Sequence, residues 1–226
     1  MQSNWIWDHT FLDNPKDDKN FICLVVLNQR MNASLFKWMY NLADFSIYAD
    51  GGSDIIKNFF KGELYNSFLS FYSSKFKPSL ILGDMDSVAE DTRKAYESLG
   101  VKILVDADVD RTDCEKALNY LEQHVIPDAM KAKERNVKII VLGAFGGRMD
   151  HTLQNINLLW MRASKSPIPQ AEIMMFDELN MMTVLRPKHN EIRRSKKMEA
   201  SKGCGIVPLA ECEQIATQGL KYNMGR

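Results

Sequence analysis

The stretch "LILGDMDSVAEDTRKAYESLGVKILV", residues 80–105, contains the pattern that decides the fold. Its two ends are short apolar runs of the kind found in strands that are buried on both faces of a sheet. The segment between them opens with a possible capping box, Ser87 and Glu90, and closes at Gly100, which suits the left-handed position after a helix. The stretch therefore predicts a strand, a helix and a second strand, which is the unit of a parallel sheet.

The same alternation continues on both sides of this stretch. We expect strands within residues 21–27, 45–52 and 137–147, and helices within residues 33–42, 112–126 and 150–163. Such alternation predicts an α/β fold, a mainly parallel sheet flanked by helices. Residues 164–170 contain two prolines and resemble a linker, and short strand candidates without a helix follow them. We therefore expect an α/β domain over residues 1–165 and a short all-β, sandwich-like domain over residues 171–226.

Composition excludes several classes of protein. The chain has 226 residues, of which 45% are hydrophobic, so it can bury a core and does not resemble a disordered chain. Acidic and basic residues balance at 29 each, which provides no overall field for nucleic acid or anionic lipid. No apolar run approaches the ~18 residues of a membrane span, and the start does not resemble a secretory signal. The four cysteines form no CxxC pair, so we expect a cytoplasmic protein with reduced thiols and with no nucleic-acid or membrane partner.

Aspartates recur where the expected strands end. They are Asp50, Asp84, Asp86, Asp108, Asp110, Asp113 and Asp150. Each one alone is explained more simply as a turn residue or a helix cap. Together they would lie along one edge of a parallel sheet, where ligands bind, and they would raise one another's pKa values unless a cation were present. Carboxylate oxygens are hard ligands, so the sequence predicts a Mg²⁺ site.

The segment "GAFGGRMDH", residues 143–151, predicts phosphate binding. Gly146 and Gly147 would let backbone N–H groups approach a phosphate, and Arg148 offers a planar fork of donors. The spacing matches neither a dinucleotide fingerprint nor a P-loop. The simpler alternative is a glycine turn followed by a surface arginine. Combined with the acids, the segment favours phosphoryl transfer, in which positioning and charge stabilisation supply most of the catalysis.

Six segments taken in order resemble the thiamine pyrophosphokinase family of the eukaryotic type. They are "YADGGSD", "ILGDMDS", "DADVDRTDCEKAL", "GAFGGRMDHTLQN", "CGIVPLAE" and "TQGLKYN". The resemblance implies an N-terminal α/β domain, a C-terminal β-sandwich and a homodimer. It also implies transfer of a pyrophosphoryl group from ATP to the hydroxyl of thiamine, which gives thiamine diphosphate and AMP.

The resemblance also assigns roles to individual residues. It implies that Asp84, Asp86 and Asp113 bind the metal. It places around the substrates Asp50, Gly51, Gly52, Thr112, Gly146, Gly147, Arg148 and Tyr222, the last as an aromatic wall for the cationic thiamine ring. The residues expected to take part in catalysis are Asp84, Asp86, Asp113, Arg148 and Asp150. Asp113 and Asp150 are the two candidates for accepting the hydroxyl proton.

Two departures from the family pattern leave other functions open. Val109 stands where glutamine is common, and the sequence ends at Arg226, before the strand and serine-rich segment that the pattern contains next. We therefore expect an incomplete sandwich with an exposed strand edge and weaker thiamine binding. The alternatives are a pyrophosphokinase for another small alcohol and a non-catalytic nucleotide-binding homologue.

Overall fold

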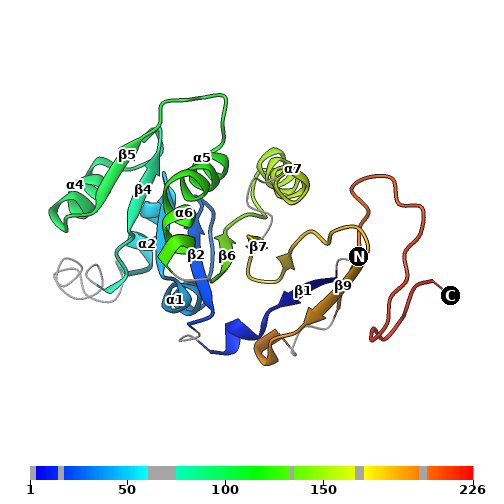
Figure 1. The fold of residues 1–226 in the computed structure, drawn as a ribbon. Helices are drawn as coiled ribbons and strands as arrows, with labels where there is room; N and C mark the ends of the chain where they lie inside the picture. Colours follow the sequence, from blue (N-terminus) through cyan, green and yellow to red (C-terminus); the bar gives the residue numbers. More distant parts are fainter. Residues whose placement is uncertain are drawn as a thin grey trace.

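A seven-stranded sheet forms the centre of the computed structural model, which describes residues 4–14, 18–60, 75–132, 135–165, 171–198 and 203–225. The strand order is β5-β4-β3-β2-β6-β7-β8, and every neighbouring pair is parallel except β7 and β8 (Figure 1). The strands are β2 (Asn20–Val26), β3 (Phe45–Ala49), β4 (Leu80–Gly83), β5 (Lys102–Val105), β6 (Asn136–Leu142), β7 (Glu172–Phe176) and β8 (Met181–Met182). The predicted mainly parallel sheet is confirmed.

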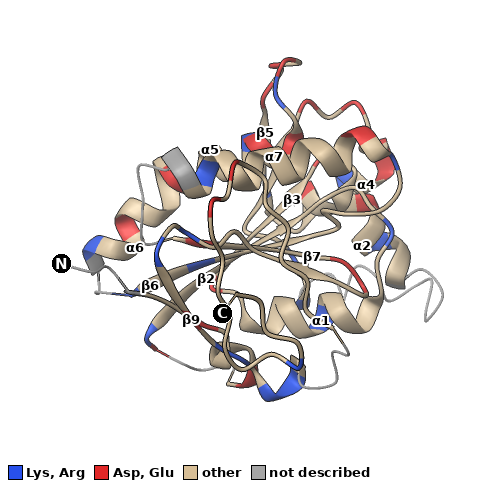
Figure 2. Ribbon diagram, turned by 90° about the vertical axis from the view of Figure 1, so that its right-hand side faces the viewer, with Lys and Arg blue, Asp and Glu red and all other residues tan. Residues whose placement is uncertain are grey.

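Helices cover both faces of this sheet (Figure 2). They are α1 (Ala33–Leu42), α2 (Gly52–Phe60), α4 (Glu90–Ser98), α5 (Asp113–Tyr120), the π-helix η3 (Leu121–Val125), α6 (Ile126–Ala132) and α7 (Met149–Lys165). Successive side chains of a strand point to opposite faces. Accordingly, Cys23 and Val25 of β2 pack with α5 and α7, while Leu24 and Val26 pack with α1 and α2. Burial on both faces explains why these strands are continuous apolar runs.

Of the two predicted helix-end signals, the one at Gly100 is confirmed and the one at Ser87 is not. The Thr112 hydroxyl accepts a hydrogen bond from the backbone N–H of Glu115 at 3.2 Å and caps α5. Gly100 has a φ of 71°, as expected for the residue after a helix. The cap expected at Ser87 is wrong, because α4 begins later and its N-cap is Ala89, which offers no side-chain acceptor.

We expected a separate all-β unit to begin at Ala171, but the strands that follow Ala171 belong to the main sheet. β7 pairs in parallel with β6, so residues 172–176 continue the α/β sheet, and β8 closes its edge in antiparallel orientation. β7 is buried throughout, which a central strand requires. Part of the predicted linker, residues 166–170, lies outside the described residues. Residues 203–225 contain no strand, so no sandwich is formed by this described segment.

A second, two-stranded parallel sheet joins the beginning of the chain to a late segment. β1 (Asn4–Asp8) pairs with β9 (His189–Arg193). Just beyond, the Asp13 carboxylate at the end of the 3₁₀ turn η1 (Thr10–Asp13) accepts hydrogen bonds from the Ser195 hydroxyl at 2.7 Å and the Lys196 N–H at 2.9 Å. The N-terminal segment is therefore built together with residues 189–198 rather than into the main sheet.

A buried group of charges attaches this N-terminal segment to the main sheet. Glu172 accepts from Lys138 Nζ at 2.5 Å and lies 2.7 Å from His9 Nε2. The three side chains belong to residues that are at most 6% exposed. Lys138 and Glu172 are register partners near the beginnings of β6 and β7, so this group lies at the sheet edge opposite the strand-end aspartates.

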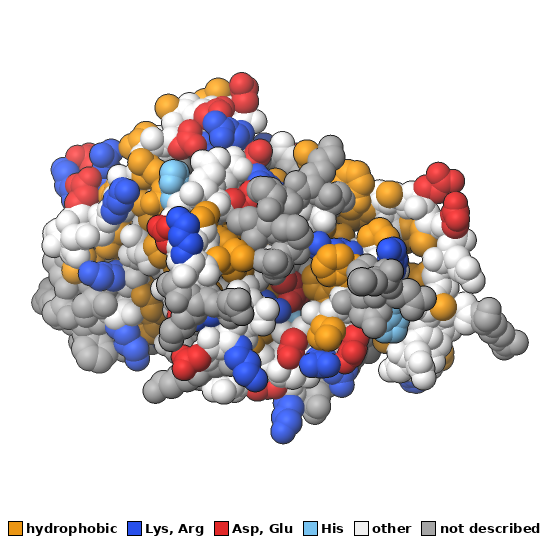
Figure 3. Space-filling view, viewed as in Figure 1, with side chains coloured by type: hydrophobic (Ala, Val, Ile, Leu, Met, Phe, Trp, Pro, Cys, Tyr) orange, Lys and Arg blue, Asp and Glu red, His pale blue; other side chains and the backbone are white. Residues whose placement is uncertain are grey.

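The surface agrees with the balanced composition. Figure 3 shows acidic and basic side chains interspersed over one face of the molecule. Among the described residues, no helix is both long and apolar enough to cross a bilayer. Residues 203–225 run along the side of the molecule beyond β1 and β9 (Figure 1), and they expose the apolar side chains of Val207, at 74%, and Tyr222, at 79%.

Candidate functional site

Three aspartates meet at the carboxyl ends of β3 and β4. Asp50 follows β3 directly and is 1% exposed, whereas Asp84 and Asp86 follow β4 and are more open. One carboxylate oxygen from each lies within 4.8 Å of the others. Because adjacent parallel strands end at the same edge, the fold itself brings these acids together. The arrangement can hold one cation between three carboxylates.

Gly83 permits the close approach of the elements that carry these acids. A Cβ atom built on Gly83 would lie 2.7 Å from Asp50 Cβ and 3.2 Å from Asp113 Oδ1. Any side chain at this position would therefore displace Asp50 or the beginning of α5. The glycine of "ILGDMDS" is required for packing inside the site.

We expect Gly83→Ala to lower activity about tenfold or more and to lower the Tm by about 2–8 °C, because overpacking costs about 1–3 kcal/mol. The matched control is Gly205→Ala, since a Cβ atom there meets nothing within 4 Å. Turnover of the substrate and thermal unfolding are measured for both variants. Equal values for the two would show that the space around Gly83 does not shape the site.

The carboxyl group of Asp50 is poorly compensated by the protein. Among the described residues, its buried Oδ1 atom has no hydrogen-bond partner, and its Oδ2 accepts one long bond, 3.3 Å, from the Ser87 N–H. Burial, followed by the nearby charges of Asp113 and Asp84, raises the pKa of Asp50 to about 6. A buried carboxylate oxygen without a donor, facing other carboxylates, fits a position for a cation. All three ligand groups offer oxygen, which suits Mg²⁺.

Asp113 borders this group without belonging to it. It begins α5, and its Oδ1 atom lies 3.7 Å from the ammonium of Lys116, which is also 3.4 Å from Asp84 Oδ2. Burial raises the pKa of Asp113, and the charge of Lys116 opposes that shift. The expected metal set was Asp84, Asp86 and Asp113, whereas in the structure Asp50 completes the group of three. Lys116 was missed by the sequence analysis, although its position one helical turn after Asp113 could have indicated it.

The glycine turn after β6 has the predicted unusual backbone. Gly143, Gly146 and Gly147 have φ values of 77°, 86° and 64°, which residues with a side chain rarely adopt. A Cβ atom on Gly147 would lie 2.7 Å from Oε1 of Gln29. Gln29 follows β2, and the sheet order reverses between β2 and β6, where open α/β sheets bind ligands. Sequence reasoning missed Gln29 because only the pairing of β2 with β6 places it here.

Gly51 and Gly52 make the turn from β3 into α2 compact. A Cβ atom on Gly51 would overlap the Asn28 side chain, and one on Gly52 would overlap the Val26 carbonyl. These two glycines therefore hold Asp50 against the end of β2. Their contribution to the site is close packing of the backbone.

Arg148 and Asp150 face each other at the beginning of α7. Arg148 Nε donates to Asp150 Oδ1 at 3.1 Å and Nη2 donates to Asp150 Oδ2 at 2.5 Å. The two side chains are 71% and 56% exposed, and this pairing lowers the pKa of Asp150. The structure thus places an exposed guanidinium beside the glycine turn, as expected, but bound to its own neighbour.

The remaining predicted acids after β5 take part in a local turn. Asp108 forms an ion pair with Arg111 at 2.5 Å and accepts a bond from the Asp110 N–H at 2.9 Å. Figure 2 shows acidic and basic segments together in the loop that rises beside β5. Asp108 and Asp110 are therefore explained as residues of a turn, without a role in binding a ligand.

Tyr222 lies apart from the strand-end acids of its own chain. It is 79% exposed, and Lys221 Nζ lies 5.4 Å from its ring centre. Figure 1 places its segment beyond β1 and β9, on the side of the molecule away from β4 and β5. The structure does not bring Tyr222 together with Asp84 or Asp86.

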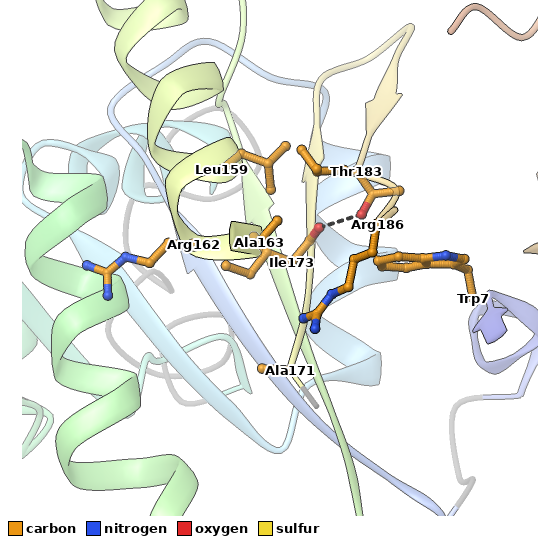
Figure 4. A pocket seen from close by; sticks show the side chains of 9 residues that line it. Trp7, Leu159, Arg162, Ala163, Ala171, Ile173, Thr183 and Arg186 are labelled. Atoms are coloured by element: carbon orange, nitrogen blue, oxygen red, sulfur yellow. Dashed lines mark hydrogen bonds between the residues drawn. The ribbon is translucent and has the colours of Figure 1, made fainter. Parts of the chain in front are cut away.

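A small cavity near the beginning of β7 is a separate feature (Figure 4). Its volume is about 20 Å³, which is room for one water molecule. It is lined by Trp7, Leu159, Arg162, Ala163, Ala171, Ile173, Thr183, Val184 and Arg186. In Figure 4 the Arg162 side chain points away from it, and that guanidinium forms an ion pair with Glu122. The cavity is too small for a nucleotide.

Comparison with known proteins identifies relatives that match most of the chain. Residues 36–169 match the sequence model described as "Thiamin pyrophosphokinase, catalytic domain", and residues 189–226 match "Thiamin pyrophosphokinase, vitamin B1 binding domain". Thiamine pyrophosphokinase 1 of Oryza sativa subsp. japonica is 30% identical over 93% of this chain and 76% of its own length. Thiamine pyrophosphokinase 1 of Arabidopsis thaliana is 28% identical over 89% of this chain and 72% of its own length.

Solved structures of similar fold agree with these matches. Thiamin pyrophosphokinase from Candida albicans superposes with a TM-score of 0.67 at 21% identity, covering 86% of this chain and 68% of that one. The yeast enzyme gives a TM-score of 0.65 at 18% identity, covering 83% and 68%. At these identities the likeness supports the fold alone.

Proposed function

The chain belongs to the thiamine pyrophosphokinase family, and we propose that the acids at the carboxyl ends of β3 and β4 form its reaction site. Its activity is that of a thiamine diphosphokinase, which transfers the pyrophosphoryl group of ATP to the hydroxyl of thiamine and releases AMP. The observation that carries the site is the meeting of Asp50, Asp84 and Asp86 oxygens within 4.8 Å. A different alcohol acceptor or a purely binding role is not favoured, because both family sequence models match.

We propose Mg²⁺ as the metal that these three carboxylates hold, with Asp113 beside it. The support is the all-oxygen donor set and the buried Asp50 Oδ1 atom, which has no hydrogen-bond partner. When bound, such an ion neutralises charge on the phosphates and helps to align the transferred group.

The residues around this acidic group have proposed tasks of binding and orientation. Backbone N–H groups of the Gly143–Gly147 turn approach the phosphate oxygens of ATP. Arg148 donates to those oxygens after exchanging its bond to Asp150 for one to the nucleotide, which its exposure permits. Asp113 and Asp150 are the two carboxylates proposed to accept the thiamine hydroxyl proton. In this class of reaction, alignment of the hydroxyl with the β-phosphorus supplies much of the rate enhancement.

We propose that residues 189–225 supply the thiamine pocket and that Tyr222 stacks on the cationic ring. This assignment rests on the match to the vitamin B1 binding model and on the exposure of Tyr222. Because Tyr222 is remote from the acids of its own chain, we further propose a homodimer in which each pocket faces the acids of the other copy. The α/β domain would then extend through β8, and β9 would begin the thiamine-binding part together with β1.

A cytoplasmic location is also proposed. The support is that Cys23, Cys114, Cys204 and Cys212 are all free thiols, as expected in a reducing compartment.

The test of the function is an assay of the purified chain with ATP, Mg²⁺ and thiamine. We expect AMP and thiamine diphosphate to appear in equal amounts, with no AMP when thiamine is omitted or when EDTA replaces Mg²⁺. Other primary alcohols are offered in competition, and they should neither be phosphorylated nor slow the reaction at equal concentration. Binding of ATP and Mg²⁺ in calorimetry without any thiamine-dependent AMP would instead support a non-catalytic homologue.

A further inference from the structure

Lys116 is a buried cation inside the acidic group. It lies on α5 between the core residues Cys114, Ala117 and Leu118, and its side chain is 1% exposed. A lysine ammonium is almost never buried unless it is paired, because desolvation of the charge is costly. The ion pairs of Lys116 among the described residues are with Asp84, which follows β4, and with Asp113, which begins α5.

We propose that Lys116 is a positioning residue that holds Asp84 and Asp113 in place and substitutes for the divalent cation when the metal is absent. This inference rests on the proposed metal site. The ammonium joins two elements that both carry acids of the site, and it reaches them from the interior. A metal ion would enter the same group from the open side, where Asp84 and Asp86 are partly exposed.

The distances support a shared counter-ion rather than a tight pair. Lys116 Nζ lies 3.4 Å from Asp84 and 3.7 Å from Asp113, whereas the similarly buried Lys138 lies 2.5 Å from Glu172. Lys116 Nζ therefore lies between two carboxylates and forms a short ion pair with neither of them. Asp84 also belongs to the group that it forms with Asp50 and Asp86.

The balance of charge predicts how Lys116 and a divalent cation affect each other. One ammonium cannot neutralise the four neighbouring carboxylates of Asp50, Asp84, Asp86 and Asp113, so these acids still attract a cation. Asp84 would face both positive charges, and each of them therefore weakens the binding of the other. Without Lys116 the metal-free protein would lose stability, and a divalent cation would restore more of it than in the unchanged protein.

The experiment measures the Tm of the full chain in EDTA and in Mg²⁺, without nucleotide, for the unchanged protein, Lys116→Met and Lys138→Met. Lys138→Met is the matched control, because Lys138 is also buried and paired, but with Glu172 at the opposite edge of the sheet. In EDTA we expect both variants to lose about 6–15 °C, since breaking a buried ion pair is strongly destabilising. We expect the rise in Tm produced by Mg²⁺ to be about 3–5 °C larger in Lys116→Met than in the other two proteins, which corresponds to about tenfold tighter Mg²⁺ binding.

The possible failures are distinguishable. An equal Mg²⁺-dependent rise in all three proteins would overturn the role of Lys116 and leave the metal site intact. The complete lack of a Mg²⁺ response in the unchanged protein would overturn the metal site and this inference with it. If Lys116→Met does not fold, Lys116→Gln is measured in the same way, and a rise no larger than that of the unchanged protein again overturns the proposal.

Discussion

Asp84→Asn is expected to lower kcat/KM for thiamine diphosphate formation by about a thousandfold or more, because it removes a charge on which the transition state depends. Asp84 offers an oxygen to the group with Asp50 and Asp86, and its Oδ2 atom lies 3.4 Å from Lys116 Nζ. Asparagine has nearly the same shape and retains one oxygen, so the fold should remain intact while the charge is lost. The loss should appear in kcat, since metal and phosphates are held together only in the reacting complex.

Release of AMP and of thiamine diphosphate is the measurement, and the Tm of each variant checks that it is folded. Asp108→Asn provides the control, because Asp108 also follows a strand end but is paired with Arg111 in its own loop. That control should retain activity within about threefold of the unchanged protein, as is usual for exposed ion pairs of little energetic weight. Undiminished AMP release by a folded Asp84→Asn variant would remove Asp84 from the mechanism.

The layout of the main sheet could be predicted because its strands carry the signals of burial on both faces. Continuous apolar runs separated by helical segments indicated β2, β4 and β6. In the structure all three strands belong to one sheet. The prolines of residues 164–170 suggested that a separate all-β unit begins at Ala171, but β7 belongs to the main sheet. A strand, a crossing helix and a second strand normally place both strands in the same sheet, and β6, α7 and β7 do so. The pairing of β1 with β9 had no signal, since it joins segments far apart in the sequence.

The location of the acidic site could be predicted from the sequence, whereas the metal set of Asp84, Asp86 and Asp113 stays a prediction. Strand ends of a parallel sheet share an edge, which was enough to bring Asp84 and Asp86 to Asp50. The approach of Asp50 to Asp84 and Asp86 depends on the space that Gly83 leaves beside it and on the φ of 45° at Asp50. These are properties of packing, which residue types alone do not determine. Gln29 was missed because only the pairing of β2 with β6 places it at the site. The spacing of Lys116 from Asp113 indicates at most their ion pair, and not the one that Lys116 forms with Asp84.

The second large effect is expected at Asp50, where Asp50→Asn should separate activity from stability. Activity should fall at least about a hundredfold, since one of the three carboxylates loses its charge. In EDTA at pH 8, however, the variant should be more stable than the unchanged protein, with a Tm higher by about 3–6 °C. The φ of 45° at this position is not an obstacle, because asparagine tolerates the left-handed region better than most residues do.

The pH dependence of that gain follows from the pKa of Asp50. Folding raises this pKa from 3.8 to about 6, so the folded state favours the protonated carboxyl group. Below pH 3.8 the group is neutral in both states and costs nothing, and the cost of its charge grows until the pH exceeds the folded pKa. Asparagine is neutral at every pH, so the Tm advantage of the variant should be small at pH 4.5 and complete above about pH 7.

Addition of Mg²⁺ at pH 8 should reverse the order of the two proteins. A cation among the three carboxylates compensates the charge of Asp50, so it removes the cost that Asp50→Asn avoids and stabilises the unchanged protein more than the variant. Thermal unfolding at pH 4.5 and pH 8, each with EDTA and with Mg²⁺, measures all four combinations. A Tm advantage that is equal at both pH values would show that Asp50 does not ionise at a cost in the folded chain. An advantage that persists undiminished in Mg²⁺ would show that Asp50 does not hold the metal, because the same buried carboxylate must destabilise the metal-free protein and bind the cation.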